Sequence, residues 1–187
     1  MKISTNKQEL LKLKACKSGF DEFVKAHGDK SEVLFSECLK SNGWDDTWWL
    51  IKEVYSQLSI KQTIDLHLLG CDWAESVLCN FESEYPDDSR PRLAIEAKRK
   101  FIAGEISEEQ LAEARVEVVK ASSSAELLAS RAAACAAACA AVNAAACSEA
   151  VKAEWAAASS AAMSASSSGT IAAQKADLMN LFLKWEK

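Results

Sequence analysis

The chain has little of the chemistry that makes tight turns. Its 187 residues include only two prolines and six glycines. A β-barrel or β-sandwich needs turn residues roughly every 8–12 positions, so both classes are excluded. Apolar residues instead recur with a helical period along most of the chain, which predicts an all-α fold without a sheet. We expect a multi-helix bundle in a single domain, residues 1–187.

Motifs of catalysis and metal binding are also missing. There is no glycine-rich phosphate loop, no HExxH and no GxSxG. The seven cysteines form no CxxC pair, and His27 and His67 are not spaced to complete a zinc site. We therefore expect no enzyme, no cofactor and no metal. A small-molecule enzyme would require one of the histidines beside a cysteine in a pocket.

Positive charge and long apolar runs are scarce. Basic residues number 22 against 27 acidic ones, giving a net charge of −5, which does not favour binding to nucleic acid. The first six residues lack the apolar stretch of a signal peptide. The uncharged run from Ala132 to Ser148 is too weakly apolar to span a bilayer. An odd number of cysteines is read most simply as reduced thiols, so we expect a cytoplasmic protein without a membrane partner.

Helix signals divide the chain into three subregions. Residues 1–58 are rich in tryptophan, and Thr5 or Asn6 can cap a first helix that we expect to end at Gly19. Residues 59–120 hold the core helices, beginning with one of about seven turns from Ile60 to a proline corner. In this subregion Gly104 fits a helix end and Ser107 opens a capping box.

Residues 121–187 are rich in alanine, serine and cysteine. The segment from Ala121 to Ser168 contains no proline or glycine, so a long helix is favoured over disorder, followed by a C-terminal amphipathic helix. Cys135, Cys139 and Cys147 follow one helix face together with Asn143. We interpret this stripe as a packing seam of small residues, against another helix of the chain or in a homodimer, rather than as a thiol site.

Two groups of residues are candidates for binding a partner. The corner 84–92 holds Glu84, Asp87, Asp88 and Arg90, which form either an internal network, with Arg92 pairing to Glu96, or a surface for a basic protein. Trp44, Trp48 and Trp49 are either core residues or aromatic anchors of an interface.

The same corner carries a family resemblance. The run Cys71–Leu78, Phe81–Glu82, the sequence YPDDSRPR at 85–92, AIEA at 94–97 and Gly104–Ser107 together resemble the immunity-five-like proteins of bacterial polymorphic toxin systems. The resemblance covers about residues 64 to 160. It implies an all-helical protein that neutralises a toxin by binding it, without catalysis.

Two functions follow as expectations from this resemblance. The first is an immunity protein whose partner is a toxin, with Asp87, Asp88, Arg90, Glu84, Trp44 and Trp48 as the contact residues. The alternative is a phage-encoded accessory or anti-defence protein that binds and inhibits a host enzyme, because similar alanine-rich proteins occur in phage genomes. A large toxin gene beside this one would favour the first function.

Overall fold

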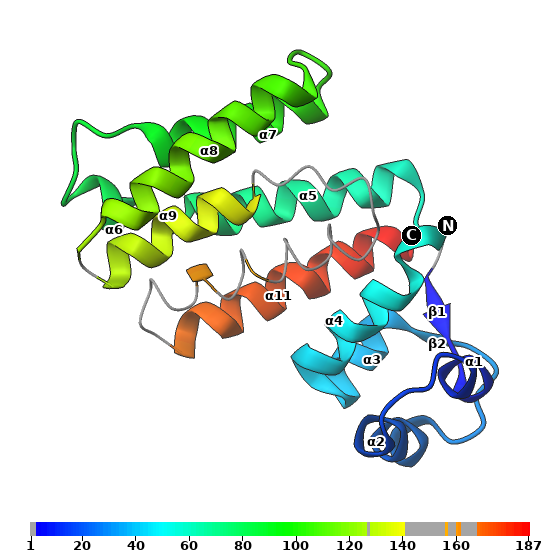
Figure 1. Cartoon of the computed structure of the whole chain (residues 1–187). Helices are drawn as coiled ribbons and strands as arrows, with labels where there is room; N and C mark the ends of the chain where they lie inside the picture. Colours follow the sequence, from blue (N-terminus) through cyan, green and yellow to red (C-terminus); the bar gives the residue numbers. More distant parts are fainter. Residues whose placement is uncertain (1–2, 127, 141–155, 157–159, 162–167) are drawn as a thin grey trace. The chain divides into compact units, whose positions relative to one another are not determined.

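The computed structural model describes residues 3–126, 128–140, 156, 160–161 and 168–187. These residues are predominantly helical, which confirms the all-α fold class (Figure 1). The helices are α1 (Lys7–Lys12), α2 (Lys17–His27), α3 (Phe35–Ser41), α4 (Gly43–Val54), the 3₁₀ helix η1 (Tyr55–Gln57), α5 (Ile60–Glu75), α6 (Cys79–Glu82), α7 (Arg90–Ile102), α8 (Glu108–Ser124), α9 (Leu128–Ala140) and α11 (Ser168–Trp185).

The expectation that the chain has no sheet is wrong in one detail. The two-residue strands β1 (Ser4–Thr5) and β2 (Val33–Leu34) pair antiparallel, with Thr5 opposite Val33. Each strand is the extended segment that leads into a helix, and the β-branched side chain of Val33 is fully buried there. Strands of this length carry no sequence period that could predict them.

The chain forms two compact units. The N-terminal unit comprises residues 1–62 and 175–187, and the central unit comprises residues 63–174. Within the N-terminal unit the end of α11 packs on α3, where Phe35 and Phe182 meet edge to face with ring centroids 5.8 Å apart. The predicted C-terminal helix therefore returns to the start of the chain, while a single domain over residues 1–187 stays a prediction.

The single helix of about seven turns predicted from Ile60 is wrong. Helix α5 ends at Glu75, and α6 begins only at Cys79. Between them the Ser76 hydroxyl donates to the Trp73 carbonyl at 2.7 Å, and the backbone tightens, with the Leu78 N–H donating to the Glu75 carbonyl at 3.1 Å. A serine hydroxyl that bonds locally in this way offers the chain an alternative to the helix.

The remaining local signals of the central unit are confirmed. Gly104 follows α7 in the left-handed region, at φ 76°. The Ser107 hydroxyl accepts the Gln110 N–H at 3.3 Å, and the Gln110 side chain accepts the Ser107 N–H at 2.9 Å, as a capping box requires. These caps fix where α7 ends and α8 begins.

The alanine-rich helix α9 packs inside the central unit. It contacts α6, α7 and α8, and its small side chains at 133, 134, 136, 137 and 140 are completely buried. Cys135 lies on the same helix with its sulfur 2.8 Å from the Ser122 hydroxyl of α8. The packing seam is thus confirmed for the described part of α9, while Asn143 and Cys147 lie outside the described residues. A homodimer through this helix stays a prediction.

Candidate functional site

The turn between α6 and α7 is held by its own tyrosine. The Tyr85 ring packs on the buried Phe81 ring, with centroids 5.0 Å apart. The Tyr85 carbonyl accepts the Asp88 N–H at 3.1 Å, and the Tyr85 hydroxyl accepts the N–H of Glu126 at 3.0 Å. The turn is therefore fixed both to the core beneath it and to the segment that follows α8.

Asp88 anchors the start of α7. Its carboxylate accepts the Arg90 backbone N–H at 3.1 Å and the Arg90 Nε–H at 2.8 Å. The guanidinium of Arg90 lowers the pKa of the Asp88 carboxyl, so the carboxylate form is favoured. Both residues are half-buried and use their charges on each other. Asp88 and Arg90, two of the predicted contact residues, are thus engaged with each other at the start of α7, and their contact with a partner stays a prediction.

Arg92 connects α7 to α6. Its guanidinium forms a two-pronged pair with Glu82, Nε to Oε1 at 2.7 Å and Nη2 to Oε2 at 2.9 Å, and also lies 3.6 Å from Glu75. The close partner of Arg92 is thus Glu82 rather than Glu96, the residue predicted one turn along α7, whose charge still contributes to raising the Arg92 pKa. Because α5 ends at Glu75, the chain turns and Glu82 of α6 comes to face Arg92. The two oxygens of the Glu82 carboxylate match two N–H groups of the guanidinium, which makes this pair the closer one.

Arg99 connects α7 to α5 in the same way. One nitrogen, Nη2, lies 2.7 Å from Asp72 Oδ1 and 2.7 Å from Glu75 Oε2. The hydrogen bond from Arg99 lowers the pKa of the Glu75 carboxyl and raises the pKa of the guanidinium. We use the name charged corner for residues 82–92 together with Asp72, Glu75 and Arg99. Its three arginines all pair with carboxylates of the corner itself.

Two predicted contact residues of the corner lie differently. Asp87 is exposed, at the tip of the turn, and makes no ion pair with any residue that the structure describes. Glu84 is half-buried in the same turn. Most charges of the corner are thus paired within the protein, whereas the carboxylate of Asp87 faces solvent.

The predicted tryptophans lie in the N-terminal unit, on α4. Trp48 is only 4% exposed and belongs to the core of that unit, so a partner does not reach it in this conformation. Trp44 is half-buried and meets Trp48 edge to face, with centroids 5.7 Å apart. Trp49 is half-buried on the same helix and lines a pocket.

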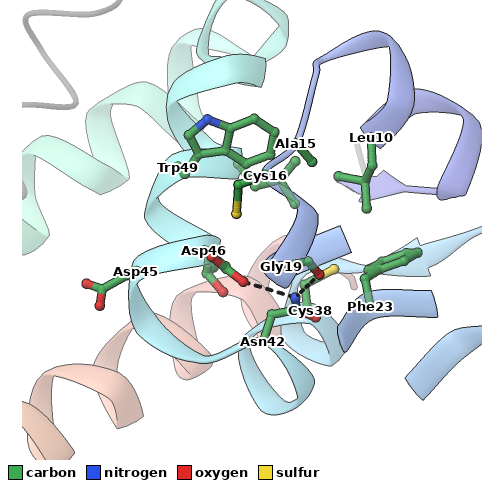
Figure 2. A pocket seen from close by; sticks show the side chains of 12 residues that line it. Leu10, Ala15, Cys16, Gly19, Phe23, Cys38, Asn42, Asp45, Asp46 and Trp49 are labelled. Atoms are coloured by element: carbon green, nitrogen blue, oxygen red, sulfur yellow. Dashed lines mark hydrogen bonds between the residues drawn. The ribbon is translucent and has the colours of Figure 1, made fainter. Parts of the chain in front are cut away.

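This pocket was not predicted from the sequence. It is a cavity of about 210 Å³ between α1, α2, α3 and α4, and we name it the N-terminal pocket. Figure 2 shows Leu10 and Phe23 on one side of it and the two carboxylates of α4, Asp45 and Asp46, on the other. Its lining is Leu10, Ala15, Cys16, Gly19, Phe23, Cys38, Asn42, Asp45, Asp46, Thr47, Trp49 and Leu50. The lining is thus mainly apolar, with acids at one edge.

Gly19 makes the wall of this pocket possible. The sequence predicted that Gly19 ends the first helix, and this is wrong, because it lies in the first turn of α2. A Cβ atom at residue 19 would lie 2.6 Å from Oδ2 of Asp46. The side-chain amide of Asn42 donates both to the Gly19 carbonyl at 2.8 Å and to Asp46 Oδ2 at 3.1 Å (Figure 2). The carboxylate of Asp46 thereby lies near the positive end of α2, which has no acid in its own first turn.

The two cysteines of the pocket differ in environment. Cys16 is exposed at the N-cap of α2, and the Ser18 hydroxyl, 3.4 Å from its sulfur, lowers its pKa. Cys38 is buried, and burial raises the pKa of its thiol to about 12. Cys16 is therefore the thiol of this pocket that a reagent in solution can reach.

No group of three or more His, Cys, Asp or Glu side chains in the described part of the chain could hold a metal ion. His27 is engaged by the Ser41 hydroxyl at 2.9 Å and packs on the Phe23 ring. None of the helices, as far as they are described, has the length and apolar character needed to cross a membrane.

Comparison with known proteins gave one match. A family model described as "Imm-5 like putative immunity protein" matches residues 56–179, about two thirds of the chain. Neither the curated proteins nor the solved structures contain a match to this chain. The matched segment includes the whole charged corner and leaves the N-terminal pocket outside it.

Proposed function

We propose that this chain, which belongs to the Imm-5 like family, is an immunity protein that neutralises a toxin by binding it and carries out no reaction of its own. The toxin itself and the binding step are the parts of this proposal that need an experiment. The family supports a protein partner, and the arrangement of charges in the corner indicates how that partner would be recognised.

The observation that supports the proposal is the division of charge in the corner. Arg90, Arg92 and Arg99 are all paired with carboxylates of the corner, which holds twice as many acids as arginines. Asp87 stands exposed on a turn whose conformation is fixed by Tyr85. A carboxylate displayed on a preorganised turn attracts a basic surface without a large entropic cost of ordering.

The proposal also takes Glu84 and Asp87 as contacts to the toxin, on the turn that Asp88 and Arg90 help to hold. Trp44 of the N-terminal unit is kept as a separate candidate contact. We place the action in the cytoplasm of the producing cell, where thiols such as those of the described cysteines stay reduced. A basic toxin surface would be drawn to this acidic protein over a distance set by the ionic strength.

The test begins with the gene beside this one: a toxin domain encoded there is expressed and purified as the partner. Cells that express the toxin domain should grow when this chain is expressed with it, and the purified pair should bind at one to one. Asp87→Lys should slow association and make it less salt-sensitive, whereas Glu105→Lys, which reverses an exposed acid outside the corner, should change neither. Growth rescue without complex formation would contradict neutralisation by binding. Wild-type association by Asp87→Lys would remove the corner from the interface.

A further inference from the structure

The N-terminal pocket is an unfilled volume between helices α1, α2, α3 and α4. Protein interiors contain few voids larger than a water molecule, because packing density approaches that of organic crystals. The pocket measures about 210 Å³. An apolar cavity of about 150 Å³ is enough to hold a benzene molecule. The pocket therefore has room for one aromatic ring or one branched aliphatic side chain.

The pocket is also accessible from solvent. Cys16 is exposed and lines it, and Ala15 and Trp49, which also line it, are only half-buried. Leu10, Phe23 and Leu50 form the buried part of its wall. An occupant can thus enter from the side of Cys16 and Trp49 and reach an apolar interior.

The charges at the edge select among occupants. Asp45 lies in the first turn of α4, with its carboxylate directed away from the cavity and exposed, and no described residue forms an ion pair with it (Figure 2). Asp46, next to it, is held by Asn42. A cation beside the apolar group of the occupant would complement this edge, whereas an anion would be repelled. A second copy of this chain would bring a net charge of −5 to the edge, so self-association is disfavoured.

We propose that the N-terminal pocket receives one aromatic or branched aliphatic side chain from a segment of a protein partner, with a lysine or arginine next to it that pairs with Asp45. This inference rests on the proposed function only in taking the occupant to be part of a protein. It assigns binding to residues outside the segment that the family model matches. The pocket would then distinguish partners independently of the charged corner.

The two cysteines that are exposed in the described part of the chain provide the test in the full-length protein. Cys16 lines the pocket, whereas Cys79 is exposed at the start of α6 in the central unit and serves as the internal control. The probes are capped peptides Gly-Lys-X-Lys-Gly, with Phe, Trp, Leu or Ile as X. At ten times its dissociation constant, a peptide in the pocket should slow alkylation of Cys16 by iodoacetamide about tenfold and leave Cys79 unchanged.

Matched variants separate the two halves of the proposal. Replacing X by serine, or both lysines by glutamate, should abolish protection of Cys16. Asp45→Asn should weaken the best peptide about two- to fivefold and remove its salt dependence, since the pair lies at the surface. Glu22→Gln, a change of an exposed acid on α2 that does not line the pocket, should have no effect. Both substitutions are at exposed positions, so the fold is retained.

Several outcomes would overturn the proposal. Millimolar peptide that protects Cys16 no more than Cys79 would show that the pocket takes no side chain of this kind. Protection by neutral indole that equals the best peptide, unchanged in Asp45→Asn, would make it a site for a small apolar molecule. Protection that rises with protein concentration alone would identify a second copy as the occupant. Failure of toxin neutralisation, in contrast, would leave a peptide-dependent result standing.

Discussion

The charged corner and the N-terminal pocket are two different kinds of contact between helices: ion pairs in the corner, and apolar side chains around an unfilled space in the pocket. In the corner, Arg92 and Arg99 of α7 reach carboxylates on α5 and α6, so that most charges are used within the protein. In the pocket, apolar side chains of four helices meet without filling the space between them. A large number of charges does not by itself make a binding surface. A partner can bind only charges that are not already paired within the protein, or a cavity that the side chains do not fill.

The largest effect is expected where the corner meets its core. Phe81 is 1% exposed and supports the Tyr85 ring, so Phe81→Ala should lower the free energy of unfolding by about 3–5 kcal/mol. Denaturant titration measures this loss. Leu11→Ala, at a half-exposed position on α1, is the control and should change stability by less than about 1 kcal/mol. A loss below 1 kcal/mol for Phe81→Ala would mean that the corner does not depend on this core contact.

A smaller effect is expected from the wall of the pocket. Gly19→Ala places a Cβ atom 2.6 Å from Asp46 Oδ2, so the Asp46 side chain must move away from Asn42. Alanine also favours the helix by about 0.5–1 kcal/mol, so the net loss of stability should be about 1 kcal/mol or less. The loss should be reduced when Asp46→Ala is introduced as well, because the clashing carboxylate is then absent. A double-mutant cycle measures this coupling. Additive effects of the two substitutions would show that Gly19 does not admit the Asp46 side chain.

Local signals and contacts between distant residues differ in how well they could be predicted. Asn6, which accepts two N–H groups of α1, and the capping box at Ser107 depend only on residues within one turn, so the sequence contains all the information that they need. The partner of Arg92 depends on where α5 ends. At that end the Ser76 hydroxyl bonds the Trp73 carbonyl, a local contact that the helical period could not reveal.

The candidate site was predictable in the same uneven way. The exposed position of Asp87 follows from a proline corner between two helices, and the family resemblance follows from the sequence of that corner. Trp48 is buried and Trp49 is only half-buried, because one face of α4 packs on the rest of the N-terminal unit. The sequence does not show which face that is. The pocket is a space between four helices, and a space has no residue pattern of its own. It could be found only once the helices were placed.

The ion pairs of the corner predict a dependence of stability on pH. Arg99 lowers the pKa of Glu75 from its ordinary value of 4.5, so the ionised carboxyl stabilises the folded state above that value. The stabilisation should be lost as the pH falls below 4.5 and through the lowered pKa of the folded state. Glu75→Gln should therefore reduce the free energy of unfolding by about 1 kcal/mol or less at pH 7, because the pair is partly exposed.

The difference between wild type and Glu75→Gln should shrink as the pH is lowered from 5 to 3. Urea titrations at each pH measure it, and Glu113→Gln, a change at an exposed position on α8, should show no such trend. A difference that grows toward low pH would contradict the direction of the pKa shift.

The smallest effect on stability is expected at Asp87. Comparing it with its neighbour Asp88 separates binding from structure most directly. Asp88 bonds the Arg90 backbone and side chain, whereas its neighbour Asp87 is exposed. Asp88→Asn should cost about 1 kcal/mol, since a charge-assisted contact is lost, and Asp87→Asn less than about 0.5 kcal/mol. The order should reverse for association with the partner, which Asp87→Asn slows more than Asp88→Asn at low salt. Thermal unfolding and stopped-flow binding measure the two orders. If Asp88→Asn were the more damaging to both stability and association, the corner would act only as scaffold, and the interface would have to be sought on another surface, first at the N-terminal pocket.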